Sequence, residues 1–171
     1  CRGTFLFGDV SGFTPLSERL SQFGKAGAER VTEIINDLFQ ELVATLSAHG
    51  GVLLKFGGDA LLGVFPAESD EAMAAGALQA VQAAMAMQGK MGRFAALEAG
   101  GKTFPLRIKC GISSGPYFAA HLGTRHSMAY VTTGHTVNRA DQAEGDATPG
   151  DVVISQATLD LLGDRAVVEP R

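Results

Sequence analysis

The spacing of hydrophobic and polar residues along the chain predicts alternating strands and helices. The short apolar segment Thr4–Asp9 is typical of a buried strand. It leads into a loop in which Thr14 is suited to cap a helix and Pro15 to occupy its first position. Over residues 31–46, apolar side chains recur three and four positions apart, which predicts a long amphipathic helix that ends at Gly50–Gly51.

The middle of the chain predicts a β-hairpin, because the apolar runs Val52–Phe56 and Ala60–Phe65 flank the turn residues Gly57, Gly58 and Asp59. The remaining elements are expected to be a second long helix from Ser69 to about Leu97, strands at 106–112, 117–122, 129–132 and 151–154, and helices at 134–144 and 156–162. This order predicts an α+β fold, a mostly antiparallel sheet flanked by helices.

Composition limits the partners of the chain. It has 171 residues, of which 46% are hydrophobic and 19% charged, as is typical of one folded domain. The net charge of −4 argues against a nucleic-acid partner or an anionic membrane surface. The longest uncharged stretch, Ala72–Gly89, is rich in alanine and contains three glutamines, so we expect no membrane span in this segment.

The cysteines and the first residue bear on where the chain comes from. Cys1 and Cys110 lack the CxxC spacing and are too few for a disulfide framework, which indicates a reducing compartment and hence a cytoplasmic protein. The first residue is Cys1 rather than Met. We therefore expect residues 1–171 to be a single domain excised from a longer protein.

Two aspartates stand where a predicted strand ends beside a glycine. Asp9 ends the first strand, and Asp59 lies at the tip of the hairpin. An aspartate in such a position either satisfies backbone N–H groups of a turn or holds a divalent cation beside a phosphate that helix N–H groups bind. Lys55 interrupts an apolar strand, a pattern that fits a solvent-facing lysine as well as a functional one. These residues by themselves leave both interpretations open.

Three motifs occur in the order known from one enzyme family. Residues Asp9–Thr14 read DVSGFT, Lys55–Asp59 read KFGGD and Gly134–Asn138 read GHTVN. Over residues 4–145 the chain resembles the catalytic domain of the class III nucleotidyl cyclases, the adenylate and guanylate cyclases. The first two motifs are most similar to those of the soluble, bicarbonate-responsive adenylyl cyclases and their bacterial relatives. The resemblance implies a ferredoxin-like core of the palm type and an enzyme that makes a cyclic nucleotide.

The resemblance also implies metal and phosphate contacts. The ligands of two Mg²⁺ or Mn²⁺ ions would be Asp9, Asp59 and the carbonyl of Val10. The triphosphate would be bound by backbone N–H groups of Gly12, Phe13 and Thr14. The implied reaction is attack of the 3′-oxygen of ATP on its α-phosphorus, which gives cyclic AMP and pyrophosphate.

The base and ribose contacts of the family come from a second domain. Lys55 would contact the purine, and Asn138 would orient the ribose and so take part in catalysis. Because one domain supplies the aspartates and its partner the lysine and asparagine, a single copy makes half of each site. The resemblance therefore implies a homodimer or a second cyclase domain as partner, and a nucleoside triphosphate as substrate, with ATP favoured over GTP.

Two positions depart from the family pattern. Gln142 stands where the family has an arginine that stabilises the transition state, and loss of such a donor typically costs about 100- to 1,000-fold in rate. Arg139, one helical turn earlier, is either a substitute or a solvent-facing residue. Val131 stands at the second base-reading position, which leaves Thr132 or the backbone to read the base. The alternative function is therefore a degenerate, non-catalytic half of a tandem cyclase that binds nucleotide or bicarbonate and regulates its partner.

Overall fold

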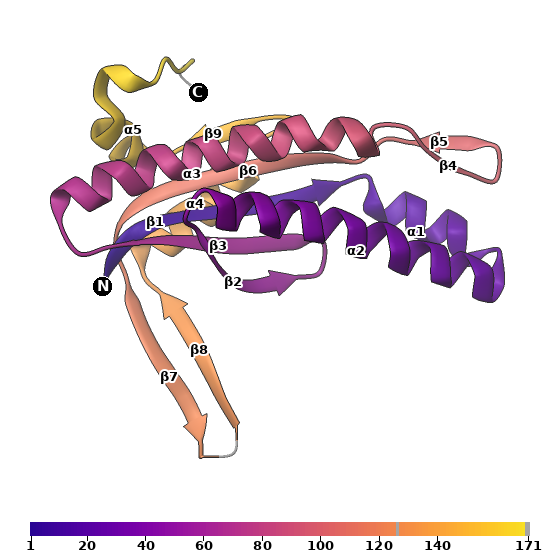
Figure 1. The fold of residues 1–171 in the computed structure, drawn as a ribbon, viewed down its shortest axis with the longest axis horizontal. Helices are drawn as coiled ribbons and strands as arrows, with labels where there is room; N and C mark the ends of the chain where they lie inside the picture. The colour runs from indigo at the N-terminus through magenta and orange to yellow at the C-terminus, as the bar shows by residue number, and fades with distance from the viewer. Residues whose placement is uncertain (126, 170–171) are drawn as a thin grey trace.

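The computed structural model describes residues 1–125 and 127–169 of the chain, and a five-stranded sheet lies at its centre (Figure 1). The strand order is β2-β3-β1-β6-β9, with bounds β1 (Arg2–Ser11), β2 (Val52–Gly57), β3 (Ala60–Ala67), β6 (Arg107–Pro116) and β9 (Val152–Ile154). Neighbouring strands are antiparallel except β6 and β9, which are parallel. The predicted α+β class with a mostly antiparallel sheet is confirmed.

The two faces of the sheet are covered unequally. Helices α1 (Phe13–Ser21), α2 (Gly24–Ala48) and α3 (Asp70–Lys90) pack on one face, and α4 (His135–Gly145) packs on the other. Figure 1 shows α2 and α3 in front of the sheet and α4 behind it. A short helix, α5 (Gln156–Leu162), packs against α3 and β6, and the 3₁₀ turns η1 (Met91–Phe94) and η2 (Gly163–Arg165) follow α3 and α5.

Strand alternation sends the side chains of β1 into two separate cores. Leu6 and Val10 join the larger core with α1, α2 and α3, whereas Phe5 lies in a smaller core with Tyr117 and Ala140 under α4. The rings of Phe5 and Tyr117 pack edge to face with centroids 4.8 Å apart. Asp9 has the same parity as Phe5, so its side chain lies on the thinly covered α4 face.

A chain of buried hydroxyl groups ties β1 and β6 to α5. Thr4 Oγ1 lies 2.8 Å from Ser114 Oγ, which lies 3.0 Å from Thr158 Oγ1. Ser155, the N-cap of α5, adds its Oγ at 3.1 Å from Thr158 Oγ1. The buried hydroxyl groups of Thr4, Ser114 and Thr158 therefore all have partners, as polar groups in an interior require.

Two hairpins extend from the sheet. One is short and consists of β4 (Leu97–Ala99) and β5 (Lys102–Phe104). The other is a ribbon of β7 (Phe118–Thr124) and β8 (Ser127–Thr133) that projects away from the body of the molecule (Figure 1). In the part of the chain that the structure describes, no helix is both long and apolar enough to cross a membrane.

Three predicted boundaries were wrong, each for a local reason. The first helix begins at Phe13 after Gly12, and no side chain caps it, so Thr14 is not its cap. Gly12 has a φ of 93°, and a Cβ at this position would collide with the Pro105 carbonyl. The alanine-rich helix ends at Lys90, because the chain tightens into η1 and then forms β4 and β5, which were not predicted. Residues 113–116, which lay between the predicted strands 106–112 and 117–122, continue β6 to Pro116.

Candidate functional site

The structure brings the two aspartates together at one end of the sheet. Asp9 lies in β1 directly opposite Ala60 of β3, and Asp59 is the turn residue that precedes Ala60. The N–H of Val10 donates a hydrogen bond to the Asp59 carbonyl at 3.1 Å, which fixes the turn against β1. Asp9 at the end of β1 and Asp59 in the turn before β3 therefore lie beside each other at this end of the sheet.

The surroundings of Asp9 disfavour its charge in the absence of a cation. Partial burial raises the pKa of Asp9 above its ordinary value, and the negative charges of Asp59 and Glu144 raise it further. The ammonium group of Lys109 acts in the opposite direction and lowers that pKa. Asp9 thus has two negative neighbours, Asp59 and Glu144, against the one positive charge of Lys109, so this end of the sheet carries excess negative charge that suits a cation.

Lys109 and Glu144 belong to this cluster, and the sequence interpretation had assigned neither of them. Lys109 lies in β6 directly opposite Asp9, and its Nζ is 3.9 Å from Asp9 Oδ2 and 2.7 Å from Glu144 Oε1. Glu144 comes from the last turn of α4. The available signal was the lysine between Ile108 and Cys110 in a buried strand, the same pattern that drew attention to Lys55.

The loop after β1 leads into an uncapped helix start. Gly12 is the N-cap of α1, and its left-handed backbone lets the chain turn sharply from β1 into the helix. The first N–H groups of any α-helix lack partners within the helix, and no side chain supplies one here. Phe13 and Thr14 form the first turn of α1, so their N–H groups lie at its positive end, where an anion is stabilised.

The residues expected at the base and ribose lie apart from the aspartates. Lys55 is exposed on the edge strand β2, where it pairs with Leu62 and so occupies the α4 face of the sheet. Asn138 is exposed on α4, and Thr132 is half-buried on β8 opposite Ala119. Among residues 1–125 and 127–169, no hydrogen bond or ion pair joins these three side chains to the aspartates.

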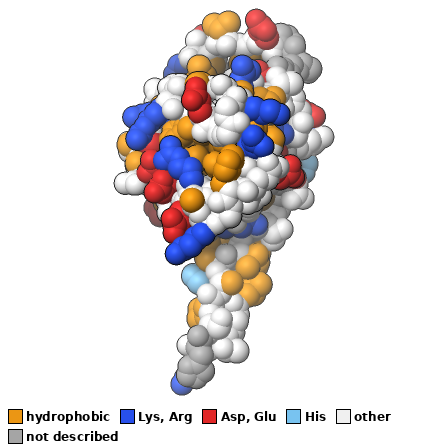
Figure 2. Space-filling view, turned by 90° about the vertical axis from the view of Figure 1, so that its right-hand side faces the viewer, with side chains coloured by type: hydrophobic (Ala, Val, Ile, Leu, Met, Phe, Trp, Pro, Cys, Tyr) orange, Lys and Arg blue, Asp and Glu red, His pale blue; other side chains and the backbone are white. Residues whose placement is uncertain are grey.

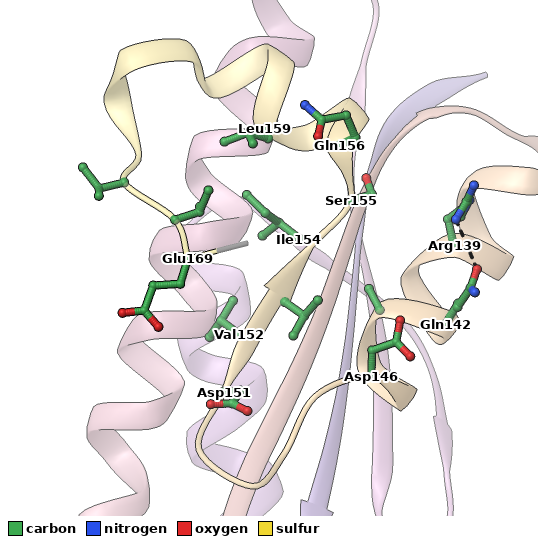
Figure 3. A pocket seen from close by; sticks show the side chains of 14 residues that line it. Arg139, Gln142, Asp146, Asp151, Val152, Ile154, Ser155, Gln156, Leu159 and Glu169 are labelled. Carbon is green, nitrogen blue, oxygen red and sulfur yellow. Dashed lines mark hydrogen bonds between the residues drawn. The ribbon is translucent and has the colours of Figure 1, made fainter. Parts of the chain in front are cut away.

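Gln142, which stands where the family has an arginine, is hydrogen-bonded within α4. Gln142 accepts a hydrogen bond from Arg139 Nη1 at 3.3 Å, and Arg139 Nε donates to His135 Nε2 at 3.3 Å. The guanidinium group is therefore held along α4. Figure 3 shows Arg139 and Gln142 side by side on α4, at the border of a groove of about 980 Å³ that α4, β9, α5 and residues 167–169 line. Neither Asp9 nor Asp59 lines this groove.

The donor set at the end of β1 fits a cation that keeps part of its shell for other ligands. In the described part of the chain, no three or more His, Cys, Asp or Glu side chains are grouped as a complete metal cage. Asp9, Asp59 and the Val10 carbonyl are all oxygen donors. Mg²⁺ is typically held by one or two carboxylates together with water and substrate phosphates, so a partial set of oxygen donors is suitable.

Comparisons with known proteins agree with this geometry. A family model described as "Adenylate and Guanylate cyclase catalytic domain" matches residues 2–170. "Adenylate cyclase type 10" of Oryctolagus cuniculus is 27% identical over 169 residues, which are 98% of this chain and 10% of that protein. The chain thus spans about a tenth of the length of that relative.

Solved structures show the same fold. The adenylyl cyclase CyaB from P. aeruginosa is similar with a TM-score of 0.79 and 30% identity, over 94% of this chain and 80% of that one. The guanylate cyclase domain of RhGC from Catenaria anguillulae, in complex with GTP, is similar with a TM-score of 0.80 and 26% identity, over 99% and 86% of the two chains. The resemblance seen in the three motifs is confirmed, and the chain belongs to the family of adenylate and guanylate cyclase catalytic domains.

Proposed function

We propose that this chain is an adenylate cyclase domain that converts ATP to cyclic AMP and pyrophosphate and contributes the metal-binding half of a site shared with a second domain. The observation that supports this most directly is the hydrogen bond from Val10 to the Asp59 carbonyl, which holds two carboxylates beside an uncapped helix start. Such a site suits a cation and a polyphosphate together.

In this proposal Asp9, Asp59 and the Val10 carbonyl would hold two Mg²⁺ or Mn²⁺ ions. Bound metal would lower the pKa of the 3′-hydroxyl and offset the charge that develops on the phosphate oxygens. The backbone N–H groups of Gly12, Phe13 and Thr14 bind the triphosphate at the positive end of α1. These backbone groups orient the α-phosphate toward the carboxylates, whatever base the nucleotide carries.

In this proposal the partner domain contacts the base and the ribose, through the residues equivalent to Lys55, Thr132 and Asn138. The separation of these residues from the aspartates within one chain supports that division. ATP is proposed as the substrate because the motifs are most similar to those of soluble adenylyl cyclases. A guanylate cyclase in complex with GTP is also among the structural relatives, so the choice of base is a question for experiment.

The proposed partner is a second copy of the chain or a second cyclase domain. The β7–β8 ribbon supports this, because Phe118, Leu122 and Met128 on it are 64%, 56% and 62% exposed. Figure 2 shows apolar side chains gathered on the ribbon where it leaves the body of the molecule. Apolar side chains concentrated on a projecting element are typical of an association surface. We place the domain in the cytoplasm, where its nucleotide substrate is available.

The test is cyclic-nucleotide production by the purified chain with Mn²⁺-ATP and with Mn²⁺-GTP. We expect weak activity that Asp59→Ala abolishes and Gln142→Arg raises, by a factor of up to about 100 to 1,000 if the arginine restores a transition-state donor. Asp37→Ala, at an exposed position on α2, is the matched control for loss of a carboxylate. Activity that survives Asp59→Ala would refute the proposal.

Gln142 favours a second candidate, a regulatory domain that binds nucleotide or bicarbonate without turnover. Gln142 is uncharged, and its amide oxygen accepts a hydrogen bond from Arg139. Residue 142 therefore offers no cationic side chain for a transition state. Equilibrium binding of ATP with and without Mn²⁺ separates the candidates. Binding that needs Mn²⁺ and is lost in Asp9→Ala supports the catalytic half, and binding independent of both supports the regulator.

A further inference from the structure

A lysine and a glutamate beside the metal-ligand candidates form an ion pair that the proposed reaction does not use. The side chains of Lys109, Glu144 and Asp9 are 21%, 12% and 27% exposed, so water screens their charges poorly. Lys109 has two acidic neighbours but does not divide itself equally between them. Its Nζ lies 2.7 Å from Glu144 Oε1 and 3.9 Å from Asp9 Oδ2.

The closer contact results from the way α4 packs on β6. Gly111 faces α4, and a Cβ there would collide with the Ala140 carbonyl and the Glu144 backbone nitrogen. The helix backbone therefore touches the strand at Gly111, two residues from Lys109 on the same face. This contact places Glu144 beside Lys109, although the two residues are 35 positions apart in the sequence.

Helix preference does not account for Glu144. A negative charge in the last turn of a helix faces the negative end of the helix dipole, which is unfavourable. The unfavourable position is offset by the ion pair with Lys109, whose ammonium group lies 2.7 Å from Glu144 Oε1. Glu144 stands against the helix dipole and contacts a lysine beside Asp9. We therefore infer that its pairing with Lys109 has a purpose other than helix stability.

The distance from the Lys109 ammonium group to Asp9 determines whether the carboxylate oxygens of Asp9 are free to bind a ligand. At 3.9 Å the ammonium group is too far from Asp9 to donate a hydrogen bond, so the carboxylate lone pairs stay open. Without Glu144, Asp9 would be the strongest acceptor left within reach of this poorly solvated ammonium group. Rotation of the flexible lysine side chain would then close the gap and occupy Asp9.

We propose that Glu144 is a positioning residue that holds the Lys109 ammonium group away from Asp9 and thereby keeps Asp9 open for a divalent cation. The inference rests on the proposed role of Asp9 as a metal ligand. It differs from a purely structural role, in which the ion pair only ties α4 to the sheet. It differs also from a direct role, in which the charge of Glu144 attracts the cation itself.

Mn²⁺ binding by the metal-free protein, followed by the electron paramagnetic resonance signal of free Mn²⁺, separates these roles without turnover. The variants are Glu144→Gln, Lys109→Met, the double variant and Asp9→Ala. Glu41→Gln is the matched control, because Glu41 also pairs with basic residues, Lys90 and Arg93, but on the opposite face of the sheet. Circular dichroism melts verify that each variant folds.

We expect Glu144→Gln to weaken Mn²⁺ binding about tenfold in the native background and less than about twofold in the Lys109→Met background, since coupled residues are non-additive. Glu41→Gln should bind as the native chain does. An equal loss in both backgrounds would show that Glu144 acts on the cation directly, and no loss in either would show a structural role; both results overturn the inference.

Two further readouts keep the failures apart. If the native chain and Asp9→Ala bind Mn²⁺ equally, the proposed metal site is wrong and the inference falls with it. If Asp9→Ala alone loses binding, the metal site stands and only the role of Glu144 is in question. A crystal structure of metal-free Glu144→Gln should place Lys109 Nζ within about 3 Å of an Asp9 oxygen, the distance of a charge-assisted hydrogen bond; an ammonium group that stays away contradicts the inference.

Discussion

Gly111→Ala is the most direct test of how α4 is placed on the sheet. A methyl group at Gly111 would collide with the Ala140 carbonyl and the Glu144 backbone nitrogen. Both atoms belong to the helix backbone, so no rotation of a side chain relieves the overlap. The helix must therefore move away from β6, and the small core around Phe5 and Tyr117 opens with it.

The expected loss follows from two opposing effects. Overpacking of a tight interior contact costs about 1–3 kcal/mol, and a rigid helix backbone places this case in the upper part of that range. Replacement of glycine restricts the unfolded chain and returns about 0.4–1 kcal/mol. The net loss of about 1–2.5 kcal/mol corresponds to a fall in Tm of roughly 2–10 °C for a chain of this size.

Thermal melts followed by circular dichroism or calorimetry provide the measurement, with Gly76→Ala as the matched control. Gly76 lies in α3, and a Cβ there would meet Phe65 Cβ at 3.4 Å and the Phe65 carbonyl at 3.6 Å, which is ordinary contact. Gly76→Ala should leave Tm unchanged or raise it, because alanine is the better helix former. A Gly111→Ala variant that melts with the native chain would refute the close packing of α4 on β6.

Three further predictions concern the same end of the sheet and its support. Asp9→Asn should raise the Tm of the metal-free protein at pH 7, because burial and the charge of Asp59 raise the pKa of Asp9 and so make its ionised form costly in the folded state. The gain should decline as the pH falls through the pKa of folded Asp9 and vanish below the ordinary aspartate value; melts that show the same gain at every pH would contradict this sign. Ser114→Ala should cost about 1–3 kcal/mol in urea unfolding, since it leaves the buried Thr4 hydroxyl without its partner, whereas the exposed Ser47→Ala should cost little. Gly12→Ala should be more destabilising than Gly24→Ala. Both positions have a positive φ, which costs about 1–2 kcal/mol for alanine, but only Gly12 also faces the Pro105 carbonyl. Equal urea midpoints for the two variants would show that the Pro105 carbonyl moves aside at no cost.

The sequence was sufficient for most of the strands and long helices, although not for β4 and β5, and for the placing of Asp9 and Asp59 at strand ends. Periodicity identified the strands and long helices because their apolar spacing is regular over many residues, and the hairpin turn at Gly57–Asp59 placed one carboxylate at the edge of β3. The resemblance then singled out Asp9 and Asp59, among the scattered acidic residues, as the proposed metal ligands. Element ends were less predictable, since the start of α1 depends on a contact between Gly12 and Pro105, 93 positions apart.

The Lys109–Glu144 pair escaped prediction for a physical reason. In sequence, Glu144 is one polar residue in a polar helix, and Lys109 is one break in an apolar strand. Their meeting depends on the closeness of α4 to β6, which a missing side chain at Gly111 permits and no local pattern reveals. A glutamate at the wrong end of a helix dipole was the one local sign that it had a partner elsewhere.

The unequal covering of the sheet has a consequence for how this domain tolerates change. Three helices and the larger core hold the fold from one side, whereas Asp9 and Lys55 lie on the side that carries α4 and the smaller core, and Gln142 lies on α4 itself. Substitutions there remove little buried apolar area, so stability scarcely constrains them. If these residues act as proposed, substrate choice and turnover can change, or be redesigned, on one side of a scaffold whose other side keeps it folded.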